Sequence, residues 1–409
     1  VHGDNHGMWI ARDAKRVIEA NDGGPSFSYD DGATWAMPHN LPIAQLYHVG
    51  YDREHPYHVC APLQDNGVWC ALSNGLGGNG ISASQWQAMG GGDGTFVMPD
   101  PSDPKIVWFS SGGGNAQGEL AYTDLRSGEV VYAQPYLRDQ NVVDPKNLKY
   151  RFNWEEPFAF DPFDAHHMWA GGNVMFSTTD RGKHWQTISG DLTRNDTTHE
   201  VITGGITLDG TGAETSDTIL YIEPSKVRRG EVWVGTDDGL VQLTLDAGKH
   251  WRNVRPPVAT AYGRFAGLSA SNRDAGTLYA VYDAHMVGDR APHVYVTHDY
   301  GAHWNDISRG LPLETEARTI RMDPRNPQLV YLGLDNGLWA SFDAGAHWRS
   351  LTLNMPAVAV RDIAVQPDAN DLLVATHGRA VYILDDLTAL QQWHNVMLSS
   401  HARERIFPV

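Results

Sequence analysis

The sequence is poor in basic residues and lacks long apolar stretches, and each shortage excludes a class of partner. Lysine and arginine number 31 against 49 aspartates and glutamates, which gives a formal net charge of −18. Phosphate binding needs a basic stripe, and the Lys and Arg residues do not gather into one, so we expect no nucleic-acid partner. No apolar run reaches the 18 residues of a membrane-spanning helix, and the opening Val1-His2-Gly3 lacks the pattern of a signal peptide.

Cysteine is also scarce, since only Cys60 and Cys70 are present. They flank the turn Gln64-Asp65-Asn66-Gly67 at nearly equal distances, which would set them opposite each other on a hairpin. Two interpretations stay open here. One is a cross-strand disulfide, which requires an oxidising compartment, and the other is a pair of free buried thiols.

Glycine and tryptophan are plentiful, with 42 and 14 copies, and many of them belong to one repeated motif. Five segments have the form S/T-x-D-x-G-x-x-W. Their aspartates are Asp30, Asp180, Asp246, Asp299 and Asp343. In such a turn the carboxylate accepts backbone N–H groups, the glycine takes a positive φ and the tryptophan packs between sheets. We therefore expect these five aspartates to be structural.

A second pattern precedes each motif: a strand of alternating apolar residues, a turn rich in Gly, Asp and Asn, and another strand. It is clear in 233–243 and in 330–340, and units without the motif keep it at 57–70 and 371–384. Eight units can be counted. They predict an all-β protein, a β-propeller of seven or eight four-stranded blades over residues 1–390, with residues 391–409 as a C-terminal tail that closes or packs against the propeller.

Each unit would consist of strands A to D. The S/T-x-D-x-G-x-x-W motif, where present, lies between C and D, and the Gly/Asp/Asn turn lies between B and C. Successive turns of a meander lie at opposite ends of the strands, so all B–C turns share one face, which we call the B–C face. We expect ligands to bind there. The residues nominated for binding are Asp22, Asp65, Asn66, Trp154, Asn173, Asp335 and His377.

These motifs resemble the Asp-box (BNR-like or sortilin-like) propeller proteins, a group that includes two-propeller xyloglucanase-type hydrolases. Further segments resemble a large bacterial branch of glycosyl-hydrolase-like repeat proteins, and the chain is similar to the second half of its longer members. These segments are His2-Gly-Asp4-Asn-His6, Asn21-Asp22-Gly23-Gly24, Leu63-Gln-Asp-Asn-Gly67, Gly90-Gly-Gly-Asp93-Gly and Arg151-Phe-Asn153-Trp154. The resemblance implies the fold and leaves the activity open, because such propellers serve as hydrolases, receptors and assembly factors.

A hydrolase of this kind would need two carboxylates facing a cleft, one as acid and one as base. Asp237, in Gly235-Thr236-Asp237, and Asp93 are the candidates. Asn173 occupies the equivalent turn of another unit and carries an amide, which cannot act as acid or base. A sialidase would need an arginine cluster, and Arg151, Arg264 and Arg379 lack the accompanying sequence context.

His2, Asp4 and His6 have a spacing that could bind a metal on an extended strand. With 19 histidines in the chain such coincidences are common, so we expect no metal and no cofactor. The chain is expected to act outside the cytoplasm, periplasmic or secreted, as a binding, scaffold or accessory subunit. Its partner would be a protein or a carbohydrate, with peripheral association to a membrane complex. The alternative is a glycoside hydrolase with paired carboxylates.

Overall fold

The computed structural model describes the chain except for residues 1, 39, 76–79, 113–118, 137–142, 204, 206–214, 258–261 and 394–409. It contains eight antiparallel sheets, six with four strands and two with three. The predicted all-β propeller class is therefore confirmed. Most of the predicted C-terminal tail, from residue 394 onward, lies outside the described residues. Within the described part of the chain, no helix is long and apolar enough to cross a membrane.

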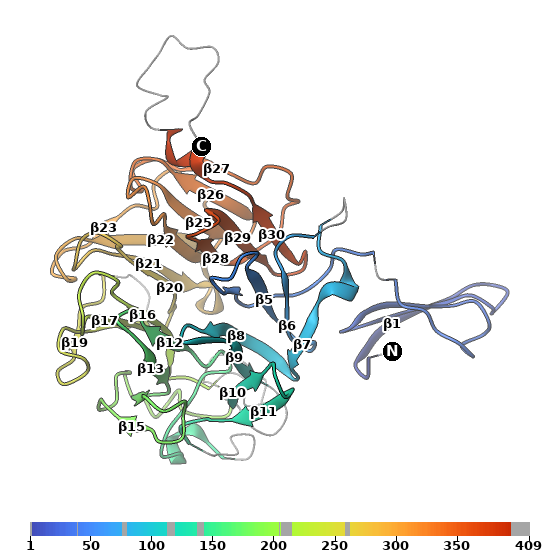
Figure 1. The fold of residues 1–409 in the computed structure, drawn as a ribbon, viewed down its shortest axis with the longest axis horizontal. Helices are drawn as coiled ribbons and strands as arrows, with labels where there is room; N and C mark the ends of the chain where they lie inside the picture. The colour runs from blue at the N-terminus through green and yellow to red at the C-terminus, as the bar shows by residue number, and fades with distance from the viewer. Residues whose placement is uncertain are drawn as a thin grey trace, which may run out of the picture.

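The strands follow one another in chain order within each sheet (Figure 1). The first sheet comprises β1 (Asn5–Ile10), β2 (Val17–Asn21) and β3 (Gly24–Ser28). The next comprises β4 (Gly50–Tyr51), β5 (His58–Leu63), β6 (Gly67–Leu72) and β7 (Gln87–Gly90). It is followed by β8 (Asp93–Asp100), β9 (Asp103–Gly112), β10 (Glu119–Asp124) and β11 (Glu129–Tyr132). The fourth comprises β12 (Phe158–Asp161), β13 (Asp164–Gly171), β14 (Met175–Thr178) and β15 (Gln186–Thr187).

The fifth sheet comprises β16 (Ile219–Pro224), β17 (Val232–Thr236), β18 (Val241–Thr244) and β19 (Arg252–Asn253). The sixth comprises β20 (Arg264–Ala270), β21 (Leu278–Ala284), β22 (Asp289–Thr297) and β23 (Asn305–Asp306). Then come β24 (Ala317–Met322), β25 (Val330–Leu334), β26 (Gly337–Ser341) and β27 (Arg349–Ser350), and finally β28 (Val360–Gln366), β29 (Asp371–Thr376) and β30 (Val381–Leu384). Short helical turns lie at Ala83–Gln85, Pro145–Asn147 and His285–Val287, and α1 (Thr388–Gln391) follows the last sheet.

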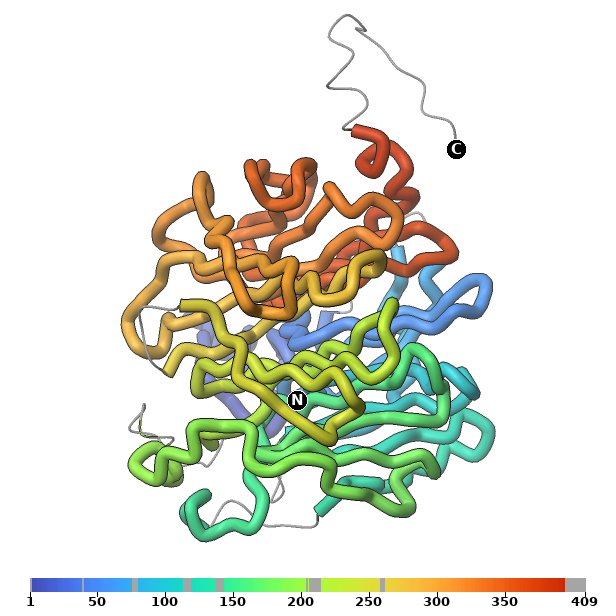
Figure 2. The backbone as a smooth tube through the Cα atoms, turned by 90° about the vertical axis from the view of Figure 1, so that its left-hand side faces the viewer, coloured from blue at the N-terminus to red at the C-terminus, as the bar shows by residue number. Residues whose placement is uncertain are grey.

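Seven of the sheets, from β4 to β30, form a closed ring of blades, and Figures 1 and 2 show its blue first blade beside its red last one. The closure is made by an antiparallel bridge between Gln45 and His377. Arg53 adds a bidentate ion pair to Asp368, with N–O distances of 2.6 and 2.7 Å. One apolar cluster contains Val59 of the first blade and Leu373 of the last. The ring therefore joins residues more than 300 positions apart.

The second strand of most blades is buried on both faces, which explains its continuous apolar sequence. β17 and β25 have no exposed residue, and Trp233 in β17 is fully buried. Apolar clusters lie between neighbouring blades, as in the one that joins Trp233 to Phe265 and Tyr282. Each sheet thus packs against the next one around the ring, and this burial supplies the main driving force for the fold.

The remaining sheet, β1–β3, stands beside the ring in Figure 1. All six residues of β1 are exposed, among them the large side chains of Met8 and Trp9. Its contacts with the ring run through the turn after β5, where the Asn66 amide donates to the Asp22 carbonyl at 2.9 Å. The predicted range of 1–390 therefore covers the ring and this separate sheet.

The five motif turns share one hydrogen-bond pattern. In each of them the aspartate Oδ1 accepts the N–H of the residue four positions on, at 2.8 to 3.0 Å. Three of the tryptophans, Trp185, Trp304 and Trp348, donate Nε1–H to a carbonyl of the preceding blade at 2.7 Å. These three turns hold adjacent blades together, whereas Trp35 and Trp251 donate within their own turns. The histidines that precede four of the tryptophans are exposed.

Candidate functional site at the mouth of the central channel

Inner strands of four successive blades contain a β-bulge at the same place. In β16, β20, β24 and β28 the register shifts across one residue near the start of the strand. The bulged residues are Leu220, Ala266, Arg318 and Arg361. A bulge re-aims the side chain of its extra residue, and all four of these side chains line one pocket on the ring axis. The repeat thus places two arginines of neighbouring blades at equivalent positions.

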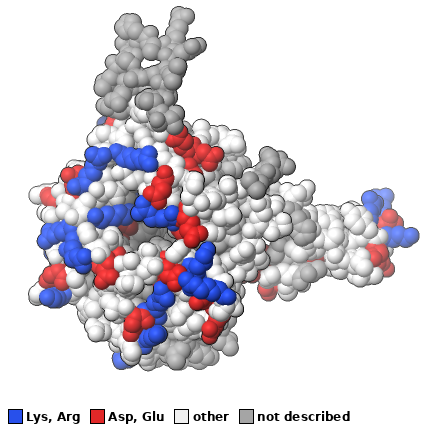
Figure 3. Space-filling view, in the orientation of Figure 1, with Lys and Arg blue, Asp and Glu red and all other residues white. Residues whose placement is uncertain are grey.

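The pocket opens where the inner strands begin, at the B–C face. Its volume is about 20 Å³, which is room for one or two water molecules. Its walls are Tyr47, His48, Glu155, Leu220, Arg264, Ala266, Asp283, Arg318 and Arg361. Three guanidinium groups therefore meet two carboxylates here, in a chain whose overall charge is strongly negative. Figure 3 shows basic side chains close to the centre of the ring, with acidic side chains beside them.

Two of the three arginines of the pocket, Arg264 and Arg361, are only partly engaged by acceptors among the described residues. Arg318 donates to Asp283 at 2.7 Å and to Asp335 at 3.1 Å. Arg361 donates from Nη2 to Glu155 at 3.2 Å, and Arg264 reaches Asp283 only at 3.5 Å, through Nε. Among the described residues, no hydrogen bond is made by Nη1 or Nη2 of Arg264, nor by Nε or Nη1 of Arg361. Burial and the neighbouring Arg318 and Arg264 lower the pKa of Arg361.

The two carboxylates of the pocket are held ionised. Burial acts to raise the pKa of Glu155, but Arg361 and His48 outweigh it and hold that pKa at about 2. Burial likewise acts against the charge of Asp283, and His285 with Arg264 and Arg318 brings the pKa of Asp283 well below its usual value. Neither group can therefore serve as a general acid at neutral pH, because neither holds a proton there.

A second polar layer lies below the pocket and ties the blades together. The His48 ring stacks on Phe96 with a centroid distance of 3.6 Å, and its Nδ1 lies 3.3 Å from Asp362. Arg321 donates to the Tyr221 hydroxyl at 2.8 Å. Although burial acts to lower it, the pKa of His48 is raised by Asp362 and Glu155. The floor of the channel is thus a buried network of ion pairs.

Asp237, one of the two nominated catalytic residues, lies on the B–C face and is not among the residues that line this pocket. It is partly exposed, and its carboxylate accepts the Thr218 N–H at 2.8 Å, the Thr218 hydroxyl and the Asn153 amide at 3.0 Å. Burial, with help from the nearby Asp217, raises the pKa of Asp237 to about 7. Three donors therefore already fix this carboxyl.

Asn173 lies in the neighbouring blade, and its side-chain amide is engaged in hydrogen bonds within the protein. Its Oδ1 accepts the Arg151 N–H at 3.1 Å, and its Nδ2 donates to Asp191 at 2.7 Å. Arg151 is buried and pairs with Asp191 and Glu200, so it takes no part in the arginine cluster of the channel. Trp154 packs over Gly112, where an added Cβ would lie 2.5 Å from the indole ring.

Asp93, the second nominated catalytic residue, meets three of the predicted binding residues at the junction with the β1–β3 sheet. The buried Asp93 carboxylate accepts the Asp65 N–H, and Asn66 contacts Asp22 as described above. Burial raises the pKa of Asp93 to about 6, and Asp65 and Asp22 add to the effect. The structure thus brings Asp22, Asp65, Asn66 and Asp93 together, and it places Asp237 in a different blade.

Asp335 and His377 lie at the channel mouth or close to it. Asp335 pairs with Arg318, and His377 forms part of the bridge that closes the ring, with its Nδ1 3.3 Å from the Leu46 carbonyl oxygen. Cys60 and Cys70 are paired directly across β5 and β6, and the structure joins them in a disulfide. This geometry corresponds to the first of the two interpretations left open by the sequence.

Most residues of the pocket were not predicted from the sequence, among them Tyr47, His48, Asp283, Arg318 and Arg361. A signal was present for the last two: the segments Ala317-Arg318-Thr319 and Val360-Arg361-Asp362 align when the inner strands of the units are superimposed. Arg264 was considered, and it does belong to an arginine cluster, but its companions are Arg318 and Arg361. Arg379, considered with it, lies in the turn that leads into β30.

Comparison with solved structures agrees with the class of protein that this architecture defines, a β-propeller. The chain is similar to the GH74 xyloglucanase from Xanthomonas campestris, with a TM-score of 0.59 and 16% identity over 84% of this chain and 52% of that one. It is similar to an ancestral GH74 enzyme with a TM-score of 0.57 and 16% identity, over 86% of this chain and 46% of that one.

It is also similar to YCF48 from Cyanidioschyzon merolae, with a TM-score of 0.54 and 12% identity over 85% of this chain and 98% of that one. The chain spans about half of the length of the two hydrolases and matches nearly all of YCF48. At such identities the likeness concerns the fold alone. No family model matches the chain, and no curated protein matches it either.

Proposed function

We propose that the chain is a non-catalytic binding propeller that holds an acidic group of a protein or carbohydrate partner at the mouth of its central channel. Support comes from the pocket, where Arg264, Arg318 and Arg361 converge and where Arg264 and Arg361 keep unused N–H donors among the described residues. Guanidinium groups recognise carboxylates through paired, charge-assisted hydrogen bonds. The small volume suits the carboxylate itself, with the rest of the partner lying on the B–C face.

The absence of an acid and base pair in the pocket favours binding over catalysis. Glu155 and Asp283 are both ionised there, whereas a glycosidase needs one protonated and one ionised carboxyl on either side of the scissile bond. We place the protein outside the cytoplasm, periplasmic or secreted, because the Cys60–Cys70 disulfide requires an oxidising compartment. Peripheral attachment to a membrane complex is compatible with this role.

A glycoside hydrolase remains the second candidate, on one observation. Asp93, with a pKa of about 6, lies beside Asp65 and Asp22, and a carboxyl with a raised pKa near other carboxylates is the arrangement of an acid and base pair. A hydrolase would act there, at the junction with the β1–β3 sheet, rather than in the channel.

The experiment measures binding and turnover together. Oligoglutamate peptides and oligogalacturonates serve as acidic probes, with neutral xyloglucan oligosaccharides as the comparison, in calorimetry at low and high salt. We expect acidic probes alone to bind, and Arg361→Gln to weaken them about 10- to 100-fold, the effect of losing one or two charge-assisted hydrogen bonds. Arg126→Gln, an exposed arginine on the outer side of another blade, is the matched control and should change nothing.

Two results would reject the proposal. Equal binding of acidic probes by the Arg361→Gln variant and the parent would show that the channel mouth is not the site. Release of reducing sugar from xyloglucan, abolished by Asp93→Asn and unaffected by Arg361→Gln, would establish the hydrolase instead.

A further inference from the structure

The junction between the β1–β3 sheet and the ring gathers segments that are distant in the sequence. Antiparallel pairing of β1 with β2 sets Asn5 opposite Asn21, which places Asp4 beside Asp22, whose N–H donates to the Asp4 carbonyl at 3.2 Å. His2 reaches the turn after β5, since its Nε2 lies 3.3 Å from the Asp65 carbonyl oxygen. Four of the segments that carry the family resemblance meet at this one place.

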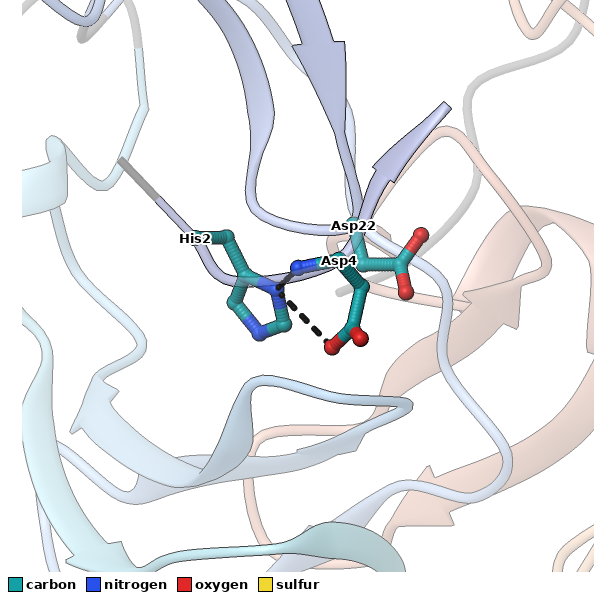
Figure 4. A group of neighbouring side chains, drawn as sticks. All are labelled: His2, Asp4 and Asp22. Carbon is teal, nitrogen blue, oxygen red and sulfur yellow. Dashed lines mark hydrogen bonds and ion pairs between the residues drawn. The ribbon is translucent and has the colours of Figure 1, made fainter.

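Three side chains at the junction have the arrangement of metal ligands. One ligand atom each from His2, Asp4 and Asp22 lies within 4.8 Å of the others, and Figure 4 shows the His2 ring facing the Asp4 carboxylate. The His2 Nδ1 and the Asp4 Oδ2 are 3.4 Å apart. That separation exceeds the usual hydrogen-bond range, and it equals the edge of roughly 3.4 Å between two ligands of a tetrahedral zinc ion with bonds of about 2.1 Å.

The surroundings of the three ligands match a supporting shell for a metal. A ligating histidine ordinarily donates its second ring N–H to a backbone carbonyl, and the Asp65 carbonyl stands at that position for His2. Its Nδ1 is then the unprotonated nitrogen, and its lone pair is engaged only by a long hydrogen bond of 3.3 Å from the Asp4 N–H. On the other side, His6 Nε2 lies 2.6 Å from Asp22 Oδ1 and orients that carboxylate.

The charge at the junction favours a cation. Asp4, Asp22, Asp65 and Asp93 gather there, and within the described residues none of the four forms an ion pair with a lysine or arginine. Mutual repulsion of Asp93 with Asp65 and Asp22 contributes to its raised pKa. Gly23 permits the close approach, because an added Cβ would lie 3.1 Å from the Cβ of His2. A bound cation would offset this negative charge.

We propose that His2, Asp4 and Asp22 bind one divalent cation of the zinc class and that this ion fastens the β1–β3 sheet to the ring. One imidazole and two carboxylates suit zinc or manganese better than calcium or magnesium, which prefer oxygen ligands alone. His6 positions Asp22 from outside the coordination sphere. The site is separate from the arginine pocket and holds whether or not that pocket binds an acidic partner.

The test uses the whole chain, prepared without a polyhistidine tag and freed of metal with a chelator. Zn²⁺ is titrated by calorimetry, and the metal retained after dialysis is measured by mass spectrometry. We expect one Zn²⁺ per chain, at least 10-fold weaker binding by Asp22→Asn, and slower proteolysis of the connection between β3 and β4 when Zn²⁺ is present. The His6→Gln variant should keep the stoichiometry with a smaller loss of affinity.

The control is a second group of potential ligands, Asp52, Glu54 and His58, which already has a cation close by because Lys105 Nζ lies 3.6 Å from Glu54. Its variant His58→Ala should bind Zn²⁺ as the parent does. Loss of binding in His58→Ala with retention in Asp22→Asn would overturn the assignment. So would the absence of any retained Zn²⁺, or equal affinity of Asp22→Asn and the parent.

Discussion

Arg318 and Arg361 occupy the same bulge position on the inner strands of two neighbouring blades, and both side chains point into the pocket at the ring axis. The alignment follows from the repeat, because the inner strands β16, β20, β24 and β28 start at the same face and share the same irregularity in register. The protein thus obtains a concentrated positive charge from residues 43 positions apart, in a chain of net negative charge.

Replacing Glu155 by Gln should have opposite effects on stability and on binding. Arg361 would lose its carboxylate partner, and breaking a buried ion pair from one side costs about 3–5 kcal/mol, so the free energy of unfolding should fall by an amount of that order. Acidic probes should bind several-fold more tightly, because the Arg361 donors become available. Urea unfolding and calorimetry measure the two effects. Weaker binding of the probes would contradict the proposed role of Arg361.

Asp237→Asn should become relatively more stable as the pH rises. The pKa of Asp237 in the folded protein is about 7, above the ordinary aspartate value near 4, so the folded state holds this proton more tightly than the unfolded state. Its stabilising contribution is complete below about pH 4 and is lost as the pH rises through about 7. Asn resembles the protonated acid and avoids this loss.

The variant should therefore gain about 2–3 kcal/mol of unfolding free energy relative to the parent between pH 5 and pH 8, as measured by urea unfolding at each pH. Asp274→Asn, an exposed position whose side chain accepts no hydrogen bond from the described residues, is the control. A pH-independent difference for Asp237→Asn would mean that the carboxyl is ionised in the fold throughout this range.

Asp343→Ala should weaken the contact between the β20–β23 blade and the β24–β27 blade. The Asp343 carboxylate accepts the His347 N–H and the Ser341 hydroxyl, both at 2.8 Å, and the turn they form holds Trp348 against the Ile307 carbonyl. Loss of two such hydrogen bonds should cost about 1–2 kcal/mol of unfolding free energy. Asp274→Ala serves as the control and should stay within about 0.5 kcal/mol of the parent in urea unfolding.

Reducing the Cys60–Cys70 disulfide should destabilise the first blade of the ring. The bond closes a loop with a sequence separation of 10, for which the loss of chain entropy in the unfolded state corresponds to about 3 kcal/mol. Urea unfolding with and without dithiothreitol measures the difference, and the double variant Cys60→Ala with Cys70→Ala should show no response to the reductant. Titration of two free thiols in the untreated protein would contradict the bond.

Local patterns in the sequence are sufficient to predict the fold class, because the motif turns and the alternation of apolar residues repeat with each unit. The five motif aspartates, the turn between Cys60 and Cys70 and the B–C turns could all be placed from their immediate neighbours. Each of these features depends on residues only a few positions away, so the local sequence pattern is enough to predict it.

Which residues meet depends on the packing of the sheets and could not be predicted from local patterns. Closure of the ring set His377 beside Gln45, gathered Arg264, Arg318 and Arg361 on one axis and left the β1–β3 sheet outside. Pairing of β1 with β2 brings Asp22 to Asp4, so the group near His2 contains Asp22 where the sequence spacing had suggested His6. The physical reason is that these contacts depend on how sheets pack around an axis and on single-residue bulges, which no local pattern specifies.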